Sequence, residues 1–201
     1  MTHSMVSMTT LVLFHHVLGL TRGVISLADI VRSQGHTVLT PDLFDGRTFD
    51  ELGEGLAFAN HLGDEELLHR AEQACNGLPA DIVYGGLSLG VFPAQHLLQT
   101  RPGASGAVLL HSFFDPTQLP GAWPTKCPVE VFGMDHDPFF VGDGDLASAR
   151  VWQREHGNLH IRLYPGDGHL FLEPSLPDYD EQASRQATDD LISSLQAMER
   201  A

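Results

Sequence analysis

Apolar and polar positions along the chain follow two patterns. Short, nearly continuous apolar runs of strand length recur six times, and stretches with helical spacing lie between most of them. The runs are Thr10–His15, His36–Thr40, Asp81–Gly86, Ala107–His111, Val129–Gly133 and His160–Tyr164. Because these strands are apolar almost throughout, both faces of their sheet should be covered. The pattern predicts an α/β fold with a doubly wound, mostly parallel sheet of about six or seven strands and helices on both faces.

The helical stretches have recognisable limits. One covers Arg22–Gln34 and is followed by Gly35, a residue that favours a helix end. Phe49–His61 and Glu65–Cys75 are expected to form one or two acidic helices. The other helical stretches are Val91–Leu98, Ala147–His156 and Asp180–Met198. With 201 residues, the chain is long enough for one well-buried core and too short for two ordinary domains. We expect residues 1–201 to form a single domain, with residues 1–8 flexible.

A Gly-x-Ser-x-Gly motif joins the third expected strand to the helix after it. It covers residues 86–90. A sharp turn at this place needs glycine because the backbone approaches itself closely, and it leaves the serine exposed at the end of the strand. The candidate nucleophile is therefore Ser88.

A serine hydroxyl is a weak nucleophile at neutral pH, so it needs a histidine as base and an acid that orients this histidine. In a parallel sheet, reactive groups gather at the carboxyl ends of the strands. Asp135 and Asp137 follow the fifth expected strand, and His169 follows the sixth. Asp137 is the preferred acid because Pro138 fixes the backbone behind it, and Asp135 is the alternative.

The order serine, aspartate, histidine is that of the α/β-hydrolases and differs from the two common serine-protease orders. Asp137 and His169 are separated by one helix and one strand, so we expect no cap domain and an open site. Backbone N–H groups should stabilise the oxyanion of the tetrahedral intermediate. The candidates are the N–H of Leu89, at the start of the helix after the motif, and that of Val17, in the turn after the first strand.

The formal net charge of −15 argues against a nucleic-acid partner and an anionic membrane, because both would repel the chain. No apolar stretch approaches the ~20 residues that cross a bilayer, and no secretory signal is evident. We expect a cytoplasmic protein with a small-molecule substrate, no cofactor and no membrane partner. The sequence leaves the oligomeric state open.

Twelve histidines and two cysteines raise the question of a metal or thiol site. Cys75 and Cys127 lack Cys-x-x-Cys spacing and an adjacent histidine, and no His-x-x-x-His pattern falls on an expected helix. We therefore expect no metal. The remaining metal hypothesis uses Asp135, His136 and Asp137, although adjacent side chains on a short loop rarely converge on one ion.

Four stretches make the chain resemble the dienelactone hydrolase family of the α/β-hydrolase superfamily. They are residues 15–21, 35–46, the turn around Ser88, and 164–171. The similarity spans about residues 9–198 and implies the same triad. The namesake enzymes have cysteine at the position of Ser88, glutamate at that of His16, and an arginine within the segment that is here Leu170–Glu173. One clamp for a carboxylate-bearing dienelactone is therefore missing.

These observations predict a serine hydrolase that cleaves small carboxylic esters or lactones through an acyl-enzyme, with Ser88, Asp137 and His169 as its triad. The candidate substrate contacts are His16, Arg47, Phe139 and Phe171. The alternative from another class is a non-catalytic small-molecule-binding protein on the same fold. Such a protein would be indifferent to serine-directed phosphonates.

Overall fold

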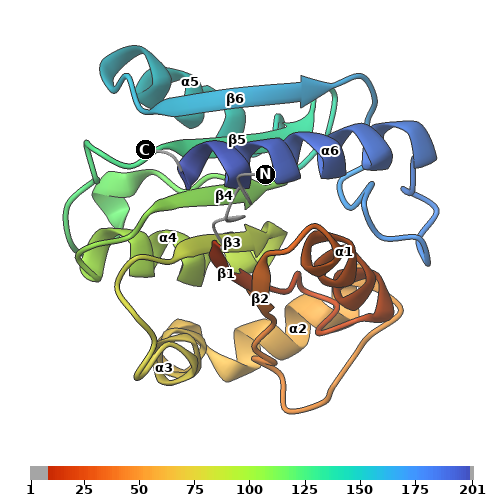
Figure 1. The fold of residues 1–201 in the computed structure, drawn as a ribbon. Coiled ribbons are helices and arrows are strands. Elements are labelled where there is room, and N and C mark those ends of the chain that lie inside the picture. The colour runs from red at the N-terminus through yellow and green to blue at the C-terminus, as the bar shows by residue number, and fades with distance from the viewer. Residues whose placement is uncertain (1–8, 200–201) are drawn as a thin grey trace, which may run out of the picture.

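The computed structural model describes residues 9–199 and places their strands in one sheet (Figure 1). The strands are β1 (Thr10–Phe14), β2 (Thr37–Leu39), β3 (Val83–Leu87), β4 (Gly106–Leu110), β5 (Val129–Met134) and β6 (Leu159–Tyr164). They lie in the order β2-β1-β3-β4-β5-β6, and every neighbouring pair is parallel. The six expected strands are confirmed, with limits that differ by one or two residues. Residues 1–8, expected to be flexible, lie outside the described part of the chain.

Helices cover both faces of the sheet, as the apolar strands predict. They are α1 (Arg22–Ser33), α2 (Leu52–Leu62), α3 (Asp64–Ala74), α4 (Val91–Thr100), α5 (Asp145–Glu155) and α6 (Glu181–Met198). One core layer joins α1 and α6 to the sheet, and the other joins α2 to α5 to its opposite face. In Figure 1, α6 crosses in front of the strands. Among the helices of residues 9–199, none has the length and apolar character that a membrane span needs.

Local signals explain where several helices begin and end. The side chain of Thr21 accepts the N–H of Val24 at the start of α1, and that of Asp180 accepts the N–H of Ala183 at the start of α6. Gly63, with a φ of 81°, separates α2 from α3. The acidic stretch therefore forms two helices, because glycine adopts this left-handed conformation without strain.

The order of the strands determines where a ligand can bind. From β1, the chain adds β2 on one side, and β3 to β6 follow on the other. In such sheets, ligands bind outside the carboxyl ends of the strands at the point where the order reverses. This edge lies on the right of Figure 1, where the strand arrows end. Ser88 directly follows β3, and the turn 15–19 follows β1, so both lie at the expected place.

Candidate active site

Ser88 directly follows β3 and is the first residue of a short 3-10 helix, η1 (Ser88–Gly90), that forms the sharp turn into α4. Its φ of 49° is in the left-handed region, which is uncommon outside glycine. A Cβ on Gly86 would clash with the carbonyl of Gly90, and a Cβ on Gly90 would clash with the carbonyl of Phe14. The motif glycines are therefore required by close backbone contacts. Strain of this kind at a serine is typical of functional sites.

A continuous hydrogen-bonded chain joins Ser88, His169 and Asp137. The Oγ of Ser88 lies 2.8 Å from Nε2 of His169, and Nδ1 of His169 lies 2.8 Å from Oδ2 of Asp137. Because the carboxylate accepts the Nδ1 proton, Nε2 keeps a lone pair that faces the serine hydroxyl. The sheet thus brings together three side chains from the ends of β3, β5 and β6.

Asp137 is fully buried and firmly held. Its Oδ1 accepts the N–H groups of Phe139 and Phe140 at 2.8 and 3.2 Å. These bonds fix the carboxylate plane and leave Oδ2 for His169. The turn Asp137–Phe140 therefore determines the tautomer of the histidine.

Asp135, the alternative acid, faces elsewhere. Its Oδ1 accepts the N–H of Gly166 at 3.1 Å and lies 2.6 Å from Nδ1 of His136, which is exposed. Asp135 therefore ties the loop after β5 to the loop that carries His169. Within residues 9–199, no group of three or more histidine, cysteine or acidic side chains is arranged to hold a metal ion. Residues 135–137 accordingly diverge instead of converging on one ion.

Buried polar groups hold the turn after β1. His16 accepts the N–H of Leu18 at Nδ1 (3.3 Å) and donates from Nε2 to Oε2 of Glu173 (3.1 Å). The carboxylate of Glu173 also accepts the hydroxyls of Thr21 (2.5 Å) and Ser175 (2.9 Å). Burial alone would raise the pKa of Glu173, but hydrogen bonds from these three side chains outweigh it and lower the pKa to about 2. The carboxylate is therefore a fixed negative charge.

Val17 lies between His16 and Leu18, which are joined by the hydrogen bond from the N–H of Leu18 to Nδ1 of His16. The turn is closed by the N–H of Gly19, which donates to the carbonyl of His16 at 3.0 Å. Val17 and Leu89, the expected sources of oxyanion donors, both line the cavity beside Ser88. His16 is 1% exposed, so it supports the turn from inside and is not placed to touch a substrate.

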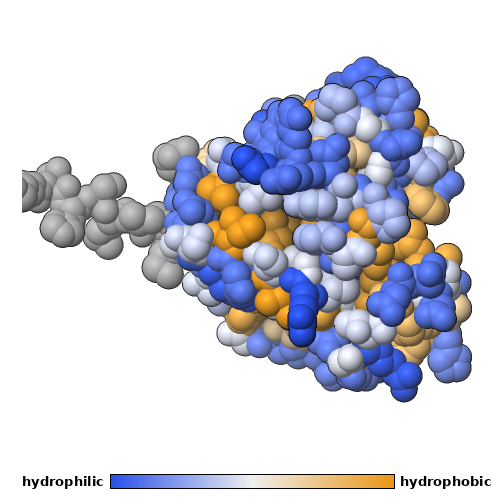
Figure 2. Space-filling model, turned by 90° about the vertical axis from the view of Figure 1, so that its right-hand side faces the viewer, coloured by the Kyte–Doolittle hydropathy of each residue, from blue (hydrophilic) through white to orange (hydrophobic). Residues whose placement is uncertain are grey.

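The cavity beside Ser88 has a volume of about 390 Å³. Its walls are mainly apolar, from Val17, Leu52, Leu56, Leu89, Phe114 and Phe139. Figure 2 looks onto this carboxyl edge and shows apolar surface among hydrophilic residues. A cavity of this size and character fits a small organic molecule.

Of the expected substrate contacts, Phe139 is the one that the structure brings to this cavity. Its ring centroid lies 4.7 Å from that of His169, and its side chain is 46% exposed. Phe171 is fully buried in the core. The guanidinium carbon of Arg47 lies 5.2 Å from the ring centroid of Phe58 on α2, outside the cavity lining. Arg47 and Phe171 were therefore wrong expectations for this cavity.

Comparison with known families decides the relationship. The profile of the dienelactone hydrolase family matches residues 2–199. The chain belongs to the dienelactone hydrolase family. The resemblance inferred from the sequence is thereby confirmed, and no curated protein gives a significant match to the chain.

Solved structures share the fold of this family member at low sequence identity. A dienelactone hydrolase-like promiscuous phosphotriesterase from metagenomic libraries has 18% identity and a TM-score of 0.73, over 94% of this chain and 86% of its own. Dienelactone hydrolase from Anabaena variabilis has 20% identity and a TM-score of 0.67, over 94% and 87%. A cold-adapted esterase from an Arctic intertidal metagenomic library has 16% identity and a TM-score of 0.56, over 94% and 83%. These similarities establish the α/β-hydrolase fold.

Membership of the dienelactone hydrolase family makes the chain a hydrolase of the ester type with a small-molecule substrate. The expected class of enzyme is thereby confirmed.

His111 of this family member was not among the site residues expected from the sequence, although it follows β4 at the same edge as Ser88. Its φ is 71°, its side chain is 1% exposed, and neither ring nitrogen has a hydrogen-bond partner within residues 9–199. Burial lowers the pKa of His111 well below its usual value, and His169 and His16 add to this shift. The ring is therefore neutral, and its centroid lies 5.9 Å from that of His169. Its place directly after a strand was the signal that could have identified it.

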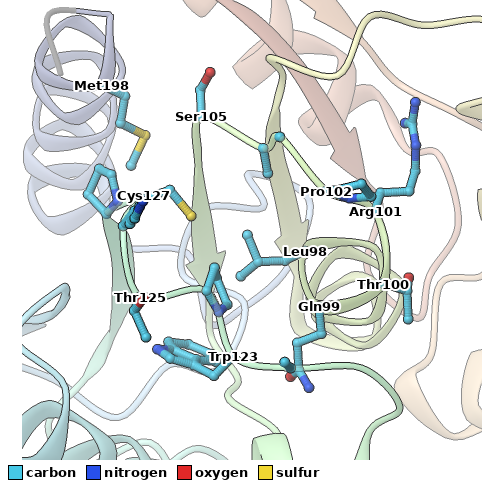
Figure 3. Close-up of a pocket in the computed structure, with 16 residues that line it drawn as sticks. Leu98, Gln99, Thr100, Arg101, Pro102, Ser105, Trp123, Thr125, Cys127 and Met198 are labelled. Atoms are coloured by element: carbon cyan, nitrogen blue, oxygen red, sulfur yellow. The ribbon is translucent and has the colours of Figure 1, made fainter.

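A larger cavity of about 810 Å³ lies at the opposite end of the sheet (Figure 3). It is lined by residues 98–105, residues 122–128 before β5, and Met198 of α6. Cys127 lies in this wall, but burial raises the pKa of its thiol, which makes it a poor nucleophile. Because its lining residues include no paired nucleophile and base, this cavity is not the candidate active site.

Proposed function

We propose that this member of the dienelactone hydrolase family is a serine hydrolase that cleaves small carboxylic esters or lactones through an acyl-enzyme. The observation that carries the proposal is the pair of 2.8 Å hydrogen bonds that links Ser88 through His169 to Asp137. Nucleophile, base and orienting acid have the mutual geometry that acyl transfer needs.

In the first half of the reaction, Ser88 Oγ attacks the carbonyl carbon while its proton moves to Nε2 of His169. Asp137 stabilises the imidazolium that forms. The histidine then gives this proton to the leaving alkoxide, and the acyl group stays on the serine as an ester. With a lactone, the alcohol remains attached to the acyl group.

In the second half, a water molecule attacks the acyl-enzyme as His169 removes its proton. Collapse of the second tetrahedral intermediate returns the proton to Ser88 and releases the acid, or a hydroxy acid from a lactone. The same base therefore serves both halves, which explains why a single histidine suffices.

The oxyanion of each intermediate would be bound by the N–H groups of Val17 and Leu89. Both residues border the cavity beside Ser88, and hydrogen bonds on either side of Val17 hold its turn in place. Loss of one such donor typically costs ~3 kcal/mol of barrier lowering. The rigid turn is consistent with an oxyanion hole that is organised before the substrate binds.

The test combines covalent labelling with turnover. A fluorophosphonate should modify wild-type protein at Ser88, as located by peptide mass spectrometry, and the Ser88→Ala variant should lose several orders of magnitude in 4-nitrophenyl ester hydrolysis. Ser112→Ala is the matched control, because Ser112 lines the same cavity but donates to Asp145. It should remain labelled at position 88.

Wild-type turnover by Ser88→Ala, or labelling at another residue, would overturn the proposal. A non-catalytic binding protein on this fold would show neither labelling nor ester turnover. The two functions are therefore separated by the same experiment.

A further inference from the structure

The cavity beside Ser88 carries negative charge that the triad does not use. It is lined by Asp145, the first residue of α5, and by Asp143 just before this helix, and no lysine or arginine is among its lining residues within the described part of the chain. Within residues 9–199, no ion pair joins either carboxylate to a basic side chain. The charge on this wall is therefore uncompensated.

Asp145 is held in a fixed position. Its Oδ2 accepts the hydroxyl of Ser112 at 2.5 Å and the N–H of Phe113 at 3.0 Å. It is the first residue of α5, where the positive end of the helix stabilises an anion. Burial raises the pKa of Asp145 above its usual value, and these two hydrogen bonds offset only part of this shift. The protein thus holds a partly buried carboxylate at the cavity without giving it a cation.

Asp143 extends this wall towards solvent. Its side chain is exposed, and its N–H donates to the carbonyl of Phe139 at 2.9 Å, which keeps its backbone next to the aromatic wall. The acidic wall therefore has an inner part, Asp145, and an outer part, Asp143.

Within residues 9–199, neither histidine of the cavity forms an ion pair with Asp143 or Asp145. His111 lines the cavity and is buried and neutral, and its ring nitrogens have no hydrogen-bond partner in the described part of the chain. Nδ1 of His169 is hydrogen-bonded to Asp137, and its Nε2 faces the Ser88 hydroxyl. Arg47, the one basic residue expected to reach a substrate carboxylate, lies over Phe58 instead.

We infer that this cavity accepts uncharged or cationic esters and rejects esters that carry a carboxylate near the reacting carbonyl, with Asp143 and Asp145 as the residues that determine this preference. The inference rests on the proposed serine esterase activity. A substrate carboxylate would lose solvent in the cavity and face two like charges, whereas an ammonium group would be attracted by them. At separations of about 7 Å, each such interaction is worth roughly a factor of ten in a partly solvated site.

Three 4-nitrophenyl esters of matched length test this preference. Their acyl chains end in methyl, trimethylammonium or carboxylate, and kcat/KM is measured for each. The variants are Asp143→Asn, Asp145→Asn and the double variant. Asparagine at position 145 keeps one oxygen that can accept from Ser112 and Phe113. Asp189→Asn on α6 is the control, because it makes the same change in net charge as each single variant but lies away from the cavity.

In wild type, the carboxylate ester should react at least about tenfold more slowly than the methyl ester, and the ammonium ester at least as fast. The ratio of ammonium to carboxylate kcat/KM should fall about tenfold or more in the double variant and stay unchanged in Asp189→Asn. Equal rates for the three esters in wild type, or an unchanged ratio in the double variant, would overturn the inference. If no ester is hydrolysed and fluorophosphonate leaves Ser88 unmodified, the proposed function fails instead. If an Asp145 variant does not fold, Asp143→Asn alone must lower the ratio for the inference to stand.

Discussion

Replacing Asp137 with asparagine tests the orientation of His169 with almost no change in side-chain shape. Oδ1 of Asp137 accepts two backbone N–H groups, from Phe139 and Phe140, so the amide oxygen of asparagine will occupy this position. The amide NH2 then faces Nδ1 of His169, where a carboxylate oxygen now lies at 2.8 Å. A donor at this place requires Nδ1 to accept, which moves the imidazole proton to Nε2. Nε2 can then no longer accept the hydroxyl of Ser88.

The expected loss follows from this tautomer change. In a triad with this arrangement, the wrong tautomer lowers kcat by about 10⁴-fold, or about 5.5 kcal/mol of barrier. The free energy of unfolding should change little, because both backbone hydrogen bonds and the packing remain. Steady-state hydrolysis of a 4-nitrophenyl ester and the rate of fluorophosphonate labelling measure the loss, and urea unfolding checks the stability.

Asp135→Asn is the matched control, since Asp135 belongs to the same loop but faces Gly166 and His136. Its kcat should stay within about tenfold of wild type, because Asp135 is partly exposed and its side-chain hydrogen bonds go to Gly166 and His136 instead of His169. Equal losses in the two variants, or a loss below about tenfold in Asp137→Asn, would refute the assignment of Asp137 as the residue that orients His169.

Three further predictions concern stability. Gly86→Ala should lower the free energy of unfolding by about 1–3 kcal/mol, because the added Cβ meets the carbonyl of Gly90. Gly53→Ala in α2 should raise it by about 0.5–1 kcal/mol, because alanine favours the helix and nothing lies within 4 Å of the added Cβ. Urea titrations measure both, and equal effects would contradict the clash. Glu173→Gln should destabilise the protein by about 1–3 kcal/mol and lower kcat, because a neutral amide replaces the carboxylate to which His16, Thr21 and Ser175 donate, and only one of its two terminal atoms can accept. Unchanged kcat with lowered stability would show that the β1 turn does not depend on Glu173. Stability should also fall as pH decreases from 6.5 to 4, because burial lowers the pKa of folded His15 to about 4 and the unfolded chain takes up the proton first. Between 4.5 and 2 it should fall again, because Glu173 keeps a pKa of about 2 only when folded. Urea unfolding at a series of pH values checks both ranges, and a flat profile would contradict these environments.

The sheet could be predicted from the sequence because its strands are buried on both faces. Strands β3, β4 and β5 are buried at every position, and their residues are apolar or glycine except for Glu130 in β5, so they show no regular alternation. Even β2, which has only three residues, was expected from the sequence as the run His36–Thr40. The limits of the elements were less certain, because helix ends depend on caps such as Gly63 and Gly144, whose conformations are set by the folded backbone.

The residues of the proposed triad could be selected from the sequence because each follows a strand, and parallel strands end at one edge. The substrate contacts could not, because they depend on where a side chain points. Arg47 is close in sequence to a family-like segment, yet its guanidinium lies over Phe58. Phe139 and Phe140 are adjacent, but Phe139 is 46% exposed beside His169 whereas Phe140 is fully buried. A difference of one position in this turn therefore decides which of the two rings lies beside His169 and which lies in the core.

Two of the three departures from the family pattern, at His16 and within Leu170–Glu173, lie far apart in the sequence and look unrelated there. In the structure they contact each other, with Nε2 of His16 3.1 Å from Oε2 of Glu173 across 157 residues of sequence. A buried carboxylate without partners is costly, so Glu173 can lie under the turn only because His16, Thr21 and Ser175 donate to it. His16 and Glu173 therefore belong to one hydrogen-bonded network, in which the donors balance the buried carboxylate and support the turn that contains Val17. Because that network is directed inwards, it replaces no substrate clamp, and the charges that face the cavity are the acidic ones at the start of α5.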